Sequence, residues 1–165
     1  MSDIIKSNIL LLDVENTLIE SFFKPTTLIN NIFTIRKFIS ENNIDKIVIF
    51  SYGLDTKSDF IKNEKLFNYI LNTDKKISCI TVDECIDIVK VKKVTPIIDS
   101  LDFFEMGYAD KRLFLLEYAN FIFSSHTNVI LIDDSFSPCK IELVDDITIN
   151  CLKIKDGTLT SVKSI

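Results

Sequence analysis

Residues 9–17 read ILLLDVENT, an apolar run of four side chains that stops at an acid. A short apolar run bounded by polar residues predicts a strand that is buried on both faces of a sheet. Two more runs of this kind, KIVIF at 46–50 and NVILI at 128–132, end at Ser51 and at Asp133. Such strands, separated by helix-length segments, predict an α/β fold: a three-layer α/β/α sandwich with a mainly parallel Rossmann-like sheet.

The other expected elements continue this alternation. Helices are expected where apolar side chains recur at helical spacing after a residue that caps helices. They cover about 26–42 (capped by Thr26 or Thr27), 55–71 (capped by Asp55 or Thr56), 83–91 and 110–123 (capped by Asp110). Two further strands are expected at 77–82 and 147–154, the second followed by a turn at Asp156-Gly157. The segment 92–108 shows no clear period.

The composition predicts one globular domain over residues 1–165. Hydrophobic residues make up 47% of the chain and charged residues 26%, with only three Gly and three Pro, so disordered tracts are not expected. The net charge of −5 disfavours non-specific binding to nucleic acid or to an anionic membrane. The four cysteines form no CxxC pair, and no apolar run suits a signal peptide or a membrane span, so a cytoplasmic protein with reduced thiols is expected.

Polar side chains follow three of the expected strands at the point where each strand ends. Asp13 and Glu15 follow the first, Ser51 the second, and Asp133-Asp134 the fourth. Parallel sheets bind ligands outside the carboxyl ends of their strands, so these side chains are expected to converge. Four carboxylates repel one another unless a cation lies among them, and oxygen ligands without His or Cys suit Mg²⁺. Beside a hydroxyl and a Gly-containing turn, such a centre predicts a site for a phosphoryl group.

The same stretches resemble motifs of the haloacid dehalogenase (HAD) superfamily. LLLDVENTL at 10–18 resembles motif I, IVIFSYG at 47–53 resembles motif II, and VILIDDS at 129–135 resembles motif IV. Lys111, which opens the helix before the last of these strands, is placed like the motif III lysine, and Lys92 or Lys93 is the alternative. The resemblance covers about residues 8–155 and implies a small HAD-like member with a minimal cap or none, because little chain is left over for a cap.

The resemblance implies a role for each matching residue. Asp13 would be the nucleophile that forms an aspartyl-phosphate, and Glu15 would be the general acid and base. The phosphate would be bound by Ser51, by the amides of Tyr52 and Gly53, and by Lys111, with Thr17 bracing the loop. Mg²⁺ would be held by Asp13, by the backbone carbonyl of Glu15, by Asp134 and by Asp133.

One position departs from the family pattern, since Glu15 stands where the active phosphatases have Asp. Misplacing a catalytic group by ~1 Å can cost ~10²-fold in rate. Two functions therefore stay open. The first is an Mg²⁺-dependent phosphatase acting on a phosphorylated small molecule, nucleotide or macromolecule. The second is a non-catalytic HAD-like metal-binding, regulatory or interaction module, such as an accessory protein of a phage or a low-GC bacterium, a source that the abundance of Ile, Lys and Asn suggests.

Overall fold

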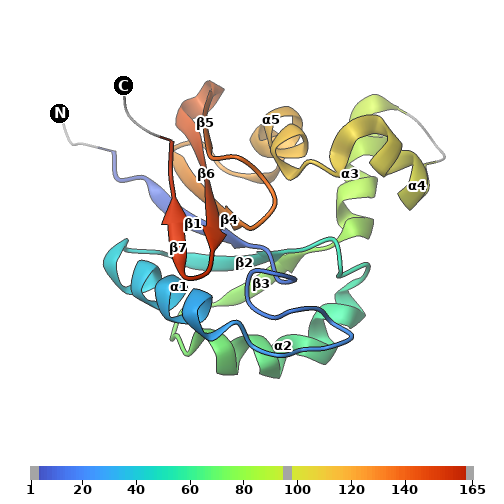
Figure 1. Cartoon of the computed structure of the whole chain (residues 1–165). Helices are drawn as coiled ribbons and strands as arrows, with labels where there is room; N and C mark the ends of the chain where they lie inside the picture. Colours follow the sequence, from blue (N-terminus) through green and yellow to red (C-terminus); the bar gives the residue numbers. More distant parts are fainter. Residues whose placement is uncertain (1–3, 95–97, 163–165) are drawn as a thin grey trace.

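The computed structural model describes residues 4–94 and 98–162, which form a sheet with helices on both faces (Figure 1). The strands are β1 (Ser7–Leu12), β2 (Lys46–Phe50), β3 (Ile77–Ile80), β4 (Thr127–Asp133), β5 (Cys139–Leu143), β6 (Ile147–Lys155) and β7 (Thr158–Thr160). The α-helices are α1 (Ile29–Glu41), α2 (Lys57–Leu71), α3 (Val82–Lys93), α4 (Ser100–Phe103) and α5 (Lys111–Ile122). A π-helical turn, η1 (Phe104–Tyr108), follows α4, and a 3₁₀ turn, η2 (Val144–Asp146), precedes β6.

The strand order places β1 and β4 side by side in the middle of the sheet. The order is β3-β2-β1-β4-β6-β5, with β7 also paired to β6, and the first five of these strands are parallel. All five α-helices lie between β1 and β4 in the chain, so the polypeptide builds one half of the sheet and then returns to its centre. This reversal is a topological switch point, where open α/β sheets bind ligands. The fold is thus α/β with a mostly parallel, seven-stranded, Rossmann-like sheet.

Both faces of the central strands are buried, which explains their uninterrupted apolar runs. Leu10 and Leu12 of β1 face the core that α1 and α2 cover, whereas Ile9 and Leu11 face the core that α3 and α5 cover. Figure 1 shows α1 and α2 below the sheet, and α3, α4 and α5 above it. The expected three layers are therefore present.

Two helices begin where the sequence predicts, and one does not. Thr56 caps α2 with a capping box, and Asp110 caps α5. The expectation that Thr26 or Thr27 caps the first helix is wrong, because the backbone there pairs with the loop after β1, through Glu20 N–H to Thr26 O and a bridge between Ile19 and Thr27. The helix begins at Ile29 with no side-chain cap. No helix among the described residues is both long and apolar enough to cross a membrane.

Other boundaries differ from the expectation for local reasons. The third strand stops at Ile80, because Thr81 forms a capping box with Glu84 and starts α3. The expected strand at 147–154 is confirmed as β6, and the stretch before it holds the strand β5 and the turn η2, neither of which the sequence predicted. The unassigned segment 92–108 extends α3 and adds α4 and η1, whose Phe103 and Tyr108 are buried in the core; residues 95–97 lie outside the described part.

Asn31 ties the loop after β1 to the turn between β6 and β7. Its side-chain amide donates to the carbonyl of Thr17 over 3.1 Å, and its amide oxygen accepts from the backbone N–H of Gly157 over 2.7 Å. Asn31 is buried at the start of α1, so both bonds are shielded from water. Three segments that are remote in sequence are thereby fixed relative to one another at the carboxyl edge of the sheet.

Replacing Asn31 with Ala is expected to lower the free energy of unfolding by about 1–3 kcal/mol, because the buried carbonyl of Thr17 and the half-buried N–H of Gly157 lose their partner. Urea denaturation measures the change. The matched control is Asn30→Ala, an exposed neighbour whose side chain forms no hydrogen bond within the described residues, and a change of at most about 0.5 kcal/mol is expected there. Equal effects of the two variants would contradict the role given to Asn31.

Candidate functional site

A hollow of about 330 Å³ opens at the carboxyl edge of the sheet, where β1, β2 and β4 end. It is lined by Asp13, Glu15, Asn16, Ser51, Tyr52, Gly53, Ala109, Lys111, Asp133, Asp134, Ser135 and Phe136. Eight of the nine residues that the sequence predicted for the site line this hollow, and the ninth, Thr17, lies behind it, bonded to Asp13. The structure therefore brings together all the predicted site residues.

Asp13 follows β1 directly and is fixed from two sides. Its backbone N–H donates to the carbonyl of Ile132 on β4 over 3.1 Å, which continues the pairing of β1 with β4. The hydroxyl of Thr17 donates to Asp13 Oδ2 over 3.0 Å. A turn formed by Val14 O and the N–H groups of Thr17 and Leu18 folds the chain back and brings this hydroxyl to the carboxylate.

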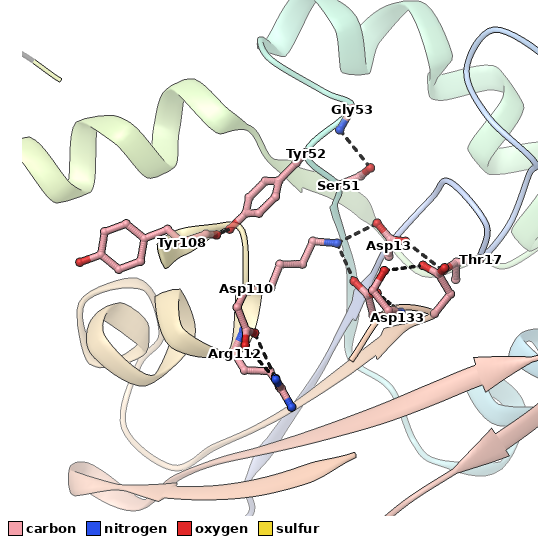
Figure 2. Close-up of polar contacts among 12 residues, drawn as sticks. Asp13, Thr17, Ser51, Tyr52, Gly53, Tyr108, Asp110, Arg112 and Asp133 are labelled. Carbon is pink, nitrogen blue, oxygen red and sulfur yellow. Dashed lines mark hydrogen bonds and ion pairs between the residues drawn. The ribbon is translucent and has the colours of Figure 1, made fainter. Parts of the chain in front are cut away.

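Lys111 joins the two central strands through their acids. Its ammonium nitrogen lies 2.7 Å from Asp13 Oδ1 and 2.7 Å from Asp133 Oδ2, and its side chain is only 5% exposed. Asp110 caps α5 immediately before it, which fixes the start of the helix and hence the position of the lysine. Figure 2 shows Asp13, Thr17 and Asp133 grouped beside the turn that carries Ser51 and Gly53.

The aromatic rings of Phe50 and Tyr52 also lie near this ammonium, each with its centroid 5.5 Å from the nitrogen. The alternative lysines of the sequence analysis do not reach the site. Lys92 and Lys93 end α3, where their ammonium groups lie over the rings of Phe121 and Tyr108. Lys111 is therefore the lysine of this hollow.

Three acids of the site are placed to share a cation. One carboxylate oxygen each of Asp13, Asp133 and Asp134 lies within 4.8 Å of the others. Asp133 Oδ1 accepts the N–H of Ser135 over 2.8 Å, and Asp134 Oδ1 accepts its hydroxyl over 3.2 Å, so the loop after β4 orients both acids. Carboxylate oxygens are the donor set of hard divalent cations, and the group could hold such a metal ion.

The charges of the cluster point the same way. Ionised, its three carboxylates and the single ammonium leave a formal charge of −2. Burial and the neighbouring Asp133 raise the pKa of Asp13 above its ordinary value, and the attraction of Lys111 only partly opposes them. Burial would by itself lower the pKa of Lys111, but the two carboxylates outweigh it and raise that pKa. The site therefore lacks positive charge, which either a proton on Asp13 or a bound cation supplies.

The turn after β2 is held open by a glycine. Ser51 is buried, and the N–H of Gly53 lies 3.4 Å from its hydroxyl oxygen. A Cβ atom on residue 53 would lie 2.4 Å from the ring of Phe22 and 2.8 Å from Glu15 Oε1. A side chain at residue 53 would therefore have to displace Phe22 and Glu15, whereas glycine lets both pack against the turn that lines the hollow.

The carboxylate of Glu15 lines the hollow but stands apart from the acid cluster. Its carboxylate accepts the backbone N–H of Phe22 over 3.1 Å and packs against Gly53. Its side chain is absent from the group of acids placed to share a cation, so only its backbone carbonyl remains a predicted ligand. The longer side chain of Glu thus reaches across to the loop between Glu20 and Thr26.

Tyr52 is turned away from the acids and supports the start of α5. Its hydroxyl donates to the carbonyl of Tyr108 over 2.6 Å (Figure 2). Its ring packs edge-on against Phe103 and Phe104. Burial raises the pKa of its hydroxyl, so Tyr52 stays neutral. Its hydroxyl therefore takes no part in the site, while its ring lies beside the Lys111 ammonium and its backbone amide remains the predicted phosphate ligand.

Several lining residues escaped the sequence analysis. Asn16 and Ser135 lie inside the quoted motifs, but the motif pattern assigns no role to their side chains. Ala109 and Phe136 have apolar side chains that give no sign of a site. Asn31, which binds the carbonyl of Thr17, could not be recognised from the sequence either. A buried asparagine at the start of a helix cannot be told from an exposed one without the structure. Only the packing of remote segments reveals these positions.

Comparisons of the chain with protein-family models, with curated proteins and with solved structures found no match. What the site does is therefore argued from its own geometry.

The raised pKa of Asp13 predicts a stability that depends on pH in the absence of metal. Between the ordinary value of 3.8 and the raised value, the unfolded chain has released a proton that the folded chain retains, so stability falls as pH rises through this window. Asp13→Asn removes the ionisation and is expected to gain at least about 1 kcal/mol relative to the wild type between about pH 4 and about pH 8.

Urea denaturation with a chelator present at each pH measures this difference. Asp74→Asn is the matched control, an exposed acid for which a constant difference from the wild type is expected. If the difference in free energy of unfolding between Asp13→Asn and the wild type stays constant over this range, ionisation of Asp13 does not destabilise the folded chain.

Proposed function

We propose that this protein is an Mg²⁺-dependent phosphatase of the HAD-like type, which hydrolyses phosphoric monoesters through an aspartyl-phosphate on Asp13. The observation that carries the proposal is the bridge from the Lys111 ammonium to Asp13 and Asp133, 2.7 Å to each. This bridge places the proposed nucleophile, Asp13, beside an ammonium group and beside Asp133, a second potential metal ligand, at the carboxyl edge of the sheet. The loop after β1 and the β2–α5 stretch insert no separate cap domain among the described residues, in keeping with a minimal cap.

Asp13 is the nucleophile in this reaction. One of its oxygens attacks phosphorus, the bond from phosphorus to the ester oxygen breaks, and the electron pair leaves with that oxygen. Thr17 and Lys111 each donate to one Asp13 oxygen and hold the carboxylate in one orientation, which favours attack because little reorganisation is needed.

The phosphoryl oxygens are bound by groups from two elements. Ser51, Tyr52, Gly53 and Lys111 all line the hollow, and the proposed phosphate ligands are the Ser51 hydroxyl, the amides of Tyr52 and Gly53, and the Lys111 ammonium. Donors fixed in advance in a partly buried site stabilise the charge that develops on a transferring phosphoryl group.

The residues present fit a magnesium ion. Asp13, Asp133 and Asp134 would hold it together with the backbone carbonyl of Glu15, and their excess negative charge matches a divalent cation. When bound, the ion supplies positive charge to the phosphoryl oxygens and lowers the repulsion between them and the carboxylate.

Glu15 is the proposed general acid and base. It protonates the departing ester oxygen and then takes a proton from the water that attacks the aspartyl-phosphate, which frees phosphate and restores Asp13. In the structure its carboxylate accepts from Phe22 N–H at the edge of the same hollow. Glu15 must exchange this bond for the ester oxygen, a movement that slows turnover relative to a shorter Asp.

That contact also favours the second candidate, a non-catalytic HAD-like metal-binding or regulatory module. A Glu that stays bound to Phe22 N–H leaves the ester oxygen without an acid, while the acid cluster still binds a cation. Activity assays and metal binding separate the two candidates.

The wild-type chain with Mg²⁺ is expected to release phosphate from para-nitrophenyl phosphate. EDTA should abolish the release, and Asp13→Asn should lower it by about 10³-fold or more, because the covalent step is lost. Asp145→Asn is the matched control, an exposed acid whose positive φ suits Asn, and it should retain full activity. A tenth or more of the activity surviving in Asp13→Asn would disprove the aspartyl-phosphate route.

Glu15→Gln is expected to lower kcat by about 10²–10⁴-fold, since Gln cannot transfer a proton, while Mg²⁺ still raises the melting temperature. Steady-state assays and thermal unfolding with and without Mg²⁺ measure both effects. The module is favoured if the wild type hydrolyses no ester in a broad panel, yet Mg²⁺ stabilises it and fails to stabilise an Asp133→Asn, Asp134→Asn double variant. Turnover gained by Glu15→Asp would then identify the module as an inactivated enzyme.

A further inference from the structure

A second hollow, of about 570 Å³, adjoins the hollow around Asp13 and Lys111 at the same edge of the sheet. It is lined by Asn16, Thr27, Leu28, Ile29, Asn30, Asn31, Asp134, Lys153, Ile154, Lys155 and Asp156. Asn16 and Asp134 line both hollows, so a molecule whose phosphate lies beside Asp13 has the second hollow within its immediate reach. Its volume is that of a small-molecule site.

The unpaired groups of this second hollow are suited to an anion. Lys153 and Lys155, from the end of β6, both line the hollow and form no ion pair within the described part of the chain, so their ammonium groups are available to a ligand. Lys153 is the register partner of Asp133, so it lies at the same strand level as the acid cluster. The acids of the lining are Asp134, which the proposed metal would neutralise, and Asp156.

Neutral donors add to the two ammonium groups. The side-chain amides of Asn16 and Asn30 form no hydrogen bond within the described residues, and both are exposed at this hollow. α1 also begins here without a side-chain cap, so its positive end adds to the potential of the lysines. These groups present donors and positive charge to whatever occupies the hollow.

The wall of the hollow is built in advance. Asn31 joins the carbonyl of Thr17 to the N–H of Gly157, which fixes the β6–β7 turn against α1 and against the loop that carries Asp13. Figure 1 shows this turn lying directly beside α1. A site with a rigid wall binds its ligand with little ordering of its own backbone.

We propose that the second hollow binds the leaving group of the substrate, and that this group is a small organic residue carrying a second anionic substituent, as in an organic bisphosphate. The assignment to the leaving group rests on the proposed function, because Asp13 must be the point of attack. A polynucleotide is disfavoured, because the net charge is −5 and the hollow offers two lysines where a nucleic-acid backbone needs an extended basic track.

The test compares butane-1,4-diol bisphosphate with butyl phosphate, two esters that share a chain and differ in the second phosphate. The wild type is expected to prefer the bisphosphate by about tenfold in kcat/KM, mainly through KM, since the second phosphate binds before the reaction. The Lys153→Ala, Lys155→Ala double variant should lose this preference and keep its butyl phosphate kinetics. Lys46→Ala, Lys75→Ala is the matched control, with the same change of charge at exposed positions outside both hollows.

Calorimetry with the Asp13→Asn variant, Mg²⁺ and the bisphosphate separates binding from turnover. If both esters are hydrolysed and both double variants keep the wild-type preference, the second hollow is not the leaving-group site, although the phosphatase stands. If no ester is hydrolysed but bisphosphate binding weakens about tenfold only with the Lys153, Lys155 change, the phosphatase is wrong and the anion site stands. Absence of both binding and hydrolysis overturns both.

Discussion

A buried ammonium group joins the ends of the two central strands. Lys111 lies between Asp13 at the end of β1 and Asp133 at the end of β4, with both nitrogen–oxygen distances at 2.7 Å. Removing water from three charged groups costs several kcal/mol per ion, and the mutual attraction offsets this cost only when the geometry is close to ideal. Apolar side chains would fill the same space at lower cost, so we infer that these charges are retained for the chemistry of the site.

The sheet topology is what makes this arrangement possible. β1 and β4 are separated by all five α-helices in the chain, yet they pair in parallel and end at the same level. Polar residues that directly follow two such strands therefore lie close together at the switch point. The loop after β2 adds Ser51 and Gly53 from the next strand, and α5 delivers the lysine from above the sheet.

The same edge continues past β4 in a way that departs from plain α/β alternation. β5 and η2 connect β4 to β6 where a helix would be usual, and β6 runs on into the hairpin with β7. This hairpin packs against the start of α1 through Asn31 and closes one wall of the second hollow. The strands that follow the standard α/β pattern thus form the hollow around Asp13 and Lys111, and the β5–β7 segment that departs from it shapes the neighbouring second hollow.

The sequence by itself determined the central strands, most of the helices and the grouping of nine residues at one hollow, because buried parallel strands leave uninterrupted apolar runs and the residues after them must lie at one edge. Lys92 and Lys93 end α3 and lie over the rings of Phe121 and Tyr108. Lys111 opens α5 and lies between Asp13 and Asp133. Only the tertiary structure decided which lysine reaches the acids. The same holds for the position of Glu15, for Asn31 and for the second hollow. These features depend on contacts between segments remote in sequence, which no local pattern encodes.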